Sequence, residues 1–245
     1  MSEGRNDSRD RSKRNPLGVA EFSEDSIGVG QVEIRTLRDT LLTPRTVLEA
    51  YMTLGPTAGG VYTRPLKLYL ALCGALMLLL FFRGGAGGIM SQLPSEFYAP
   101  LIEQSGKSSE AFLADVDSWM SLTLVPILSA FYALAAMPVL RLWDRENLGW
   151  RRGLRASFVF LNVWTITLLP IAWFSYDPQL VWITWPLTVL LGVVAFVRAG
   201  RGRWWRTPAG GVVKGVALAF LMQLAAQIGM IPVMAIGLFG GLAGP

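Results

Sequence analysis

Long apolar runs separated by short polar segments make up most of the chain after residue 64. Four runs contain no charged residue, and they cover residues 119–140, 156–176, 178–197 and 215–245. An earlier run, residues 65–82, contains a single charged residue, Lys67. Apolar stretches of about 20 residues are typical of transmembrane helices. The pattern therefore predicts an all-α polytopic membrane protein with about five transmembrane helices.

The boundaries of the apolar runs predict a transmembrane domain over residues 65–245. We expect its spans at 65–82, 119–140, 156–174, 180–197 and 212–242. A turn at 175–179 would make the third and fourth spans a helical hairpin, and a polar loop would lead to Ser118. The last stretch is longer than the roughly 20 residues that one crossing needs, and we expect Pro232 to kink it.

Two segments with different patterns precede the first span. Residues 1–30 mix charges of both signs with Ser, Asn and Gly, and their apolar residues are scattered. Such a segment buries too little surface to offset its ordering entropy, so we expect a flexible cytoplasmic tail. Residues 31–64 instead contain apolar residues at helical spacing, which predicts an amphipathic interfacial segment.

The amphipathic segment should contain one or two short helices. Thr43-Pro44 is typical of a helix start, with an N-cap residue followed by proline at the first helical position. Ile34, Leu37 and Leu41 repeat at helical spacing. We expect these side chains to turn toward lipid or the helix bundle: Leu37, Leu41, Val47, Leu48, Tyr51 and Met52. The alternative is a soluble helix pair that packs on a partner protein.

The distribution of Lys and Arg predicts the orientation in the membrane. The segment 141–155 holds five of them and the segment 198–206 holds four, whereas the segment 83–118 holds two and the turn 175–179 none. Because cytoplasmic loops are enriched in Lys and Arg, we expect the N-terminus in the cytoplasm and the C-terminus in the periplasm. The predicted location is a bacterial inner membrane.

The composition excludes several kinds of chemistry. Hydrophobic residues make up 52% of the chain and charged residues 16%, and the chain has no His and one Cys, Cys73. His-based catalysis, imidazole metal sites and Cys-rich metal sites are therefore excluded, and no nucleophile–base pair is visible. We predict no enzyme, no cofactor and no metal. The sequence pI of about 9.7 is explained by basic loops beside the spans, so no nucleic-acid partner is expected.

The few polar residues inside the spans are the remaining candidates for a site. No Asp, Glu, Lys or Arg is central in a span, which argues against ion-coupled transport. Gln223 and Gln227 share one helix face, and with Asn162 they could line a pathway or hydrogen-bond a neighbouring helix. Gly211 and Gly215 belong to a small-residue face suited to close helix contact.

Short motifs before the first span resemble those of a known family. Thr36-Leu37-Arg38, Pro44, Tyr51 and Gly60-Val-Tyr-Thr-Arg-Pro65 leading into Leu68-Tyr69 resemble the "Thr-Leu…Pro…Tyr…Tyr-x-x-Pro" pattern of an uncharacterised bacterial family of polytopic membrane proteins, a domain of unknown function. The resemblance covers about residues 34–240 and implies a five-span protein. Members often begin with a Cys-rich zinc ribbon and carry histidines near the third span; this chain has neither.

The five-span plan with a cytoplasmic amphipathic segment is also similar to the architecture of the Yip family of membrane-trafficking adaptors, an analogy that does not establish function. Our first functional hypothesis is a non-enzymatic membrane protein that serves as an accessory or scaffold subunit. It would bind membrane lipid and either a protein partner or a second copy of itself. The alternative is a transporter of small molecules or lipids that works without ion coupling.

Overall fold

The computed structural model describes residues 30–83, 85, 94–175 and 179–243. Five of the helices in these segments are long and apolar enough to cross a membrane, and no strand lies among the described residues. They are α4 (Pro65–Phe82), α6 (Ser109–Trp143), α7 (Trp150–Ser175), α8 (Val181–Gly200) and α9 (Pro208–Ala243). The predicted all-α polytopic fold is confirmed. The predicted tail up to residue 29 and the centre of the turn at 175–179 lie outside the described residues.

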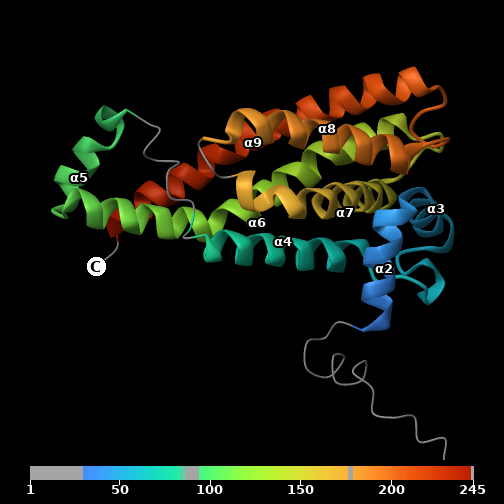
Figure 1. Ribbon diagram of the computed structural model, residues 1–245, viewed down its shortest axis with the longest axis horizontal. Helices are drawn as coiled ribbons and strands as arrows, with labels where there is room; N and C mark the ends of the chain where they lie inside the picture. The colour runs from blue at the N-terminus through green and yellow to red at the C-terminus, as the bar shows by residue number, and fades with distance from the viewer. Residues whose placement is uncertain (1–29, 84, 86–93, 176–178, 244–245) are drawn as a thin grey trace, which may run out of the picture.

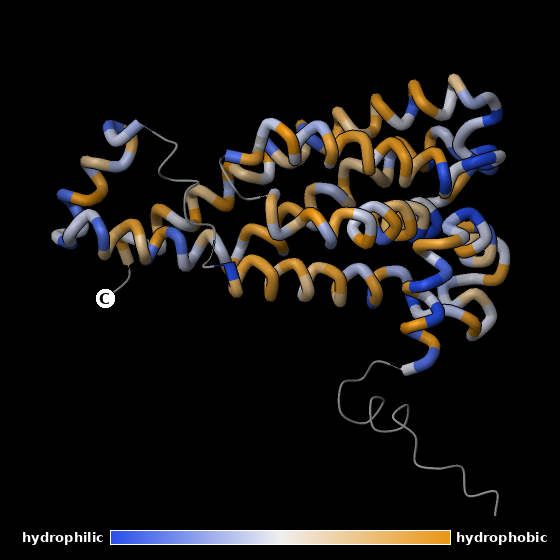
Figure 2. The backbone as a smooth tube through the Cα atoms, viewed as in Figure 1, coloured by the Kyte–Doolittle hydropathy of each residue, from blue (hydrophilic) through white to orange (hydrophobic). Residues whose placement is uncertain are grey.

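The five long helices run roughly along one axis, and α7 is the central one (Figure 1). It packs against α4, α6 and α8, and also against two short helices at one end of the bundle. Apolar residues cover the long helices, whereas polar residues gather at that end (Figure 2). We call this the basic end of the bundle, because the Arg-rich segments 141–155 and 198–206 meet there.

The helices α6 and α9 form the longest pair and extend beyond the other spans, away from the basic end (Figure 1). With 35 and 36 residues they are each over 50 Å long at about 1.5 Å per residue, against roughly 30 Å of hydrocarbon core. The expected crossing at 212–242 is thus one continuous helix that includes Pro232. A Cβ atom added at Gly237 would lie 2.5 Å from Cγ of Met120, so glycine allows the two helices to approach closely.

The prediction of a polar loop up to Ser118 is wrong for much of that segment. Residues in it form η3 (Ser95–Phe97), α5 (Ala99–Ser105) and the first turns of α6. Phe112 and Val116 continue the apolar stripe of α6 at a spacing of four residues and are fully buried beside α9. The side chain of Ser108 accepts a hydrogen bond from the backbone N–H of Ala111 and caps the helix. Packing on α9 therefore decides the structure of this charged stretch.

The amphipathic segment folds into α2 (Gln31–Leu42), α3 (Pro44–Leu54) and the short η1 (Ala58–Gly60). The second helix begins at Pro44, as the Thr43-Pro44 pair predicts. The hydroxyl of Thr43 donates to the carbonyl of Asp39 and does not cap α3, so the fixed φ of proline is what favours the start there. Both helices cover the basic end of the bundle, and α2 crosses its long axis (Figure 1).

Candidate functional site

Three segments that are distant in sequence meet at the basic end and form what we call the basic cap: α3, residues 144–149 and residues 201–207. The α8–α9 connection turns tightly because Gly202 adopts a φ of 78°, and its N–H donates to the carbonyl of Trp205. Gly200 allows the ring of Trp204 to fold back onto the chain, since a Cβ there would lie 2.4 Å from Cε3 of that ring. The turn brings Arg203 to the centre of the cap.

The guanidinium of Arg203 is completely buried and is surrounded by three carboxylates. Its Nε donates to Oδ2 of Asp144 at 2.6 Å, its Nη1 donates to Oε2 of Glu49 at 3.0 Å, and its Nη2 lies 3.2 Å from Oε2 of Glu146. The backbone N–H of Arg145 also donates to the carbonyl of Arg203. One side chain thus joins α3, the α6–α7 connection and the α8–α9 connection.

The charges in this cluster stabilise one another. Although burial acts to lower it, the pKa of Arg203 is raised by its hydrogen bond to Asp144 and by the negative charges of the three carboxylates. Partial burial acts to raise the pKa of Glu146, but the positive charges of Arg203 and Arg152 hold it below its ordinary value. Both shifts favour the charged forms of Arg203 and Glu146, and the guanidinium of Arg203 has no direct access to solvent.

Two further arginines attach the C-terminal end of α3 to α7. Nη2 of Arg152 donates to the carbonyl of Met52 at 2.9 Å and to Glu146 at 2.8 Å. Nη1 of Arg155 donates to the carbonyl of Tyr51 at 2.7 Å. Carbonyls in the last turn of a helix lack intrahelical partners and carry partial negative charge, which makes cations favourable there. Basic residues that the sequence presents as a topology signal therefore also hold the cap in place.

Beneath the ionic cluster lies an aromatic layer. The ring of Trp204 stacks on Phe196 with centroids 5.4 Å apart, and Trp143 meets the same ring edge-on at 5.7 Å. Nζ of Lys214 donates to the carbonyl of Trp204 and lies 5.3 Å from the ring centroid of Trp143. Aromatic pairs and cation–π contacts each add roughly 0.5–1.5 kcal/mol beyond area burial. The cap is thus joined to the transmembrane core by rigid side chains.

The apolar face of α3 turns toward the helix bundle. Four apolar residues on this face are at most 3% exposed: Val47, Leu48, Tyr51 and Met52. The hydroxyl of Tyr51 donates to the carbonyl of Thr63, just before the first span. Of the two orientations that the sequence left open, lipid or bundle, α3 adopts the second.

The polar candidates inside the spans lie apart from one another. Asn162 on α7 is 2% exposed, and its Nδ2 donates to the carbonyl of Pro65, the first residue of α4. Gln223 on α9 accepts a hydrogen bond from Nε1 of Trp185 on α8, and Gln227 is exposed. Asn162 and Gln223 thus hydrogen-bond different helices, α4 and α8.

The two glycine candidates on α9 make different contacts. A Cβ at Gly211 would lie 2.8 Å from the ring of Trp205, within the cap. A Cβ at Gly215 would lie 3.1 Å from Val193 and 3.3 Å from Phe196, both on α8. Gly215 therefore lies at a close contact between helices, and Gly211 makes room for an aromatic ring.

Four cavities found among the described residues all lie at the basic end. One lies between α2 and η1, and the others adjoin the α6–α7 and α8–α9 connections. None of the four is lined by Asn162, Gln223 or Gln227. The described residues also hold no group of three His, Cys, Asp or Glu side chains placed to bind a metal ion.

Sequence reasoning missed the cluster around Arg203. In the sequence Arg203 is one of four arginines between residues 198 and 206, and no motif distinguishes it from the other three. A signal was nevertheless present, because Asp144 and Glu146 are two of only three acidic residues after Asp117. Acidic residues inside a basic loop can indicate an ion-pair network, although only the fold shows which arginine they hold.

Comparisons of the chain with protein-family models, curated proteins and solved structures gave no match. The resemblance to the uncharacterised five-span family and the similarity to the Yip architecture therefore stay predictions.

Proposed function

We propose that this integral membrane protein is a non-enzymatic accessory or scaffold subunit that holds an acidic protein partner on its basic cap. The observation that carries this proposal is the cluster around Arg203, which fixes three distant segments into one preformed surface. A surface that is already ordered loses little conformational entropy on binding, so it is well suited to recognition. We place the cap in the cytoplasm of a bacterium, following the distribution of Lys and Arg.

The outer rim of the cap carries positive charges that are not paired with the carboxylates of the Arg203 cluster. Arg201 and Arg206 are exposed in the α8–α9 connection, and Arg151 is exposed at the start of α7, next to the α6–α7 connection. Arg145 is also exposed but pairs with Glu49 and Glu146 of the cluster. A cavity of about 400 Å³ opens between the two connections and is lined by Arg145, Arg206 and Lys214, with Trp143 beside them. Basic and aromatic side chains around a rigid hollow favour a partner that presents carboxylates.

The transmembrane part supports a scaffold better than a transporter. The space between α7 and α8 is filled by Phe160, Trp164 and Phe196, which contact one another through their rings. The polar side chains that a pathway would use are separated, and Asn162 is occupied by the backbone of α4.

The proposal is tested by purifying the tagged protein in mild detergent and identifying stoichiometric partners by mass spectrometry. Reversing charge on the rim, with Arg151→Glu and Arg206→Glu together, should reduce the recovered partner at least tenfold. The matched control, Arg35→Glu with Arg38→Glu, reverses the charge of two exposed arginines outside the cap and should leave recovery unchanged. Equal recovery from both variants would exclude the cap as the binding surface.

The transporter alternative predicts a different result in the same protein. In a Cys73→Ser background, a cysteine at Asn162 or Thr165 should stay unlabelled by a water-soluble thiol reagent, because both positions are buried. A cysteine at Asn147, exposed in the α6–α7 connection, serves as the labelled control. Rapid labelling at position 162 from either side of the membrane would favour transport.

A further inference from the structure

The helix α2 keeps an apolar row exposed although it is fixed to the protein. Ile34, Leu37 and Leu41 are 57%, 40% and 39% exposed. The face toward the bundle consists instead of Thr36 and Thr40, both buried, and Oγ1 of Thr36 accepts a hydrogen bond from the N–H of Thr63 at 3.0 Å. The apolar row of α2 is thus not what attaches it to the bundle.

Contacts on its two sides show which way α2 is turned. Glu33 forms an ion pair of 2.7 Å with Lys67, in the first turn of the span α4. Leu37 and Leu41 follow Glu33 by four and eight residues, so they lie on that same side of the helix. The apolar row therefore lies on the side of α2 that is near the first turn of α4, where that span would enter the membrane.

The side of α2 that adjoins the apolar row is basic, since Arg35 and Arg38 follow Ile34 by one and four residues. The guanidinium of Arg35 lies 5.8 Å from the ring centroid of Tyr62, which precedes α4, and the hydroxyl of Tyr62 donates to Asp39. Arg35 and Arg38 share this one carboxylate among the described residues, at 3.7 and 2.9 Å. One positive charge is therefore left over on this side of the helix.

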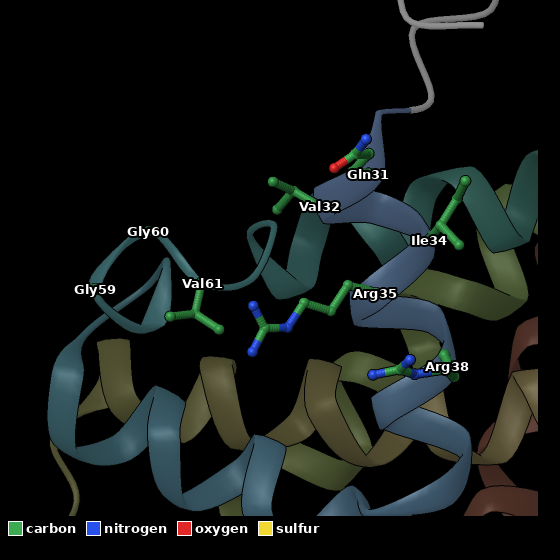
Figure 3. A pocket seen from close by; sticks show the side chains of 8 residues that line it. All are labelled: Gln31, Val32, Ile34, Arg35, Arg38, Gly59, Gly60 and Val61. Carbon is green, nitrogen blue, oxygen red and sulfur yellow. The ribbon is translucent and has the colours of Figure 1, made fainter. Parts of the chain in front are cut away.

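Both arginines border a cleft of about 690 Å³ between α2 and η1. Figure 3 shows the side chain of Arg35 directed away from Ile34, toward the loop that carries Gly59 and Gly60. Arg38 lies one turn beyond Ile34, and its guanidinium bends back to donate to Asp39. Each of these glycines has a positive φ, 69° and 89°, and neither places a side chain in the cleft. The cleft is thus lined by guanidinium groups and by the apolar side chains of Val32, Ile34 and Val61, with backbone alone at the two glycines.

We propose that α2 and η1 form a binding site for an anionic phospholipid, with the apolar row among the acyl chains and Arg35 and Arg38 on the headgroup phosphate. Guanidinium groups pair with phosphate through charge-assisted hydrogen bonds, and an amphipathic helix in the interface buries its apolar side in the acyl boundary. In Figure 1 the first turns of α2 extend past α4 to the side of the bundle, where lipid would lie. This inference does not depend on the proposed protein partner.

Lipid counting by native mass spectrometry tests the headgroup site. The intact protein in mild neutral detergent is titrated with phosphatidylglycerol and, separately, with phosphatidylcholine. We expect tighter binding of phosphatidylglycerol, weakened about thirtyfold by Arg35→Gln with Arg38→Gln, because each basic residue contributes roughly 1 kcal/mol near an anionic surface. Arg151→Gln with Arg206→Gln is the matched control and should bind as the unchanged protein does.

Two results would overturn the headgroup site. One is equal affinity for the two lipids, and the other is an equal loss of affinity in both arginine pairs. Millimolar inorganic phosphate is added in a further arm; displacement of the lipid by free phosphate would assign the cleft to a soluble anion instead.

The apolar row is tested in vesicles of phosphatidylcholine and phosphatidylglycerol that contain no other protein. A fluorescent probe on a single cysteine at position 37, in the Cys73→Ser background, should be quenched by lipid spin-labelled near the carbonyl end of its acyl chain. A probe at position 147 should not be quenched. An unquenched probe at position 37 would leave the row exposed to water and would contradict the proposal, even if the headgroup test succeeded.

Discussion

At the scale of single residues, Arg203 shows how one side chain connects distant parts of the chain. It lies in a connection between two spans, a position where arginine is expected to be solvated, yet its side chain has no exposed surface. Desolvation of a guanidinium is costly, and it is offset here by carboxylates from two other segments. The ionic cluster therefore fixes the positions of the three segments of the cap relative to one another.

The first prediction follows from the pair of Arg203 and Asp144, whose side chains are both fully buried. Asp144→Asn removes one charge and leaves the guanidinium partly uncompensated, so we expect a loss of about 3–5 kcal/mol in the free energy of unfolding. Denaturant unfolding in detergent micelles measures it. Glu110→Gln, an exposed change on α6, is the control and should stay within about 0.5 kcal/mol of the unchanged protein. Equal stability of the two variants would contradict the structural role of the cluster.

At the scale of elements, glycines decide how α6 and α9 pack. Lipid chains are as apolar as leucine, so helices in a membrane associate through close packing more than through hydrophobic burial. The glycines at 237 and 241 of α9 lie against Met120 and Val116, which are at most 1% exposed. The same contact explains why the charged start of α6 is helical.

The second prediction compares two glycines in spans. Gly237→Val places a branched side chain where a Cβ alone would be 2.5 Å from Met120, and we expect a destabilisation of about 1–3 kcal/mol from overpacking. Gly74→Val is the matched control, because a Cβ at Gly74 meets nothing within 4 Å and the change in helix propensity is the same. Unfolding of both variants in detergent measures the difference. Similar stabilities would show that the α6–α9 contact does not need glycine.

At the scale of the whole molecule, the charges that orient the chain also build its surface. Arg203 of the α8–α9 connection pairs with Glu49 on α3, and Arg152 and Arg155 of α7 donate to carbonyls near the end of α3, so residues counted in the topology signal also hold the cap together. If all five apolar helices cross the membrane once, residues before α4 and residues after α9 are expected on opposite sides of it.

The third prediction is the topology. A reporter fused after Arg206 should be cytoplasmic, and reporters fused after Lys107 and after Pro245 should be periplasmic, because the basic connections favour the cytoplasm. Paired reporters that are active on only one side of the membrane measure this. A cytoplasmic signal after both Arg206 and Pro245 would contradict a single crossing by α9.

The sequence by itself determined the number and approximate limits of the spans and the break between α2 and α3 at Pro44. Both depend on local properties: the transfer of one apolar segment into lipid, and the fixed φ of proline. The expected boundary at Ser118 failed because the first turns of α6 are stabilised by α9, more than a hundred residues away.

Only the tertiary structure decided what the amphipathic segment does. By pattern, Leu37 and Leu48 belong to similar apolar stripes, yet Leu37 is 40% exposed and Leu48 is fully buried. Likewise, nothing in the spacing of Glu49, Asp144 and Arg203 shows that they meet. Burial and pairing of this kind depend on which surfaces the folded bundle brings together, and a linear pattern does not contain that information.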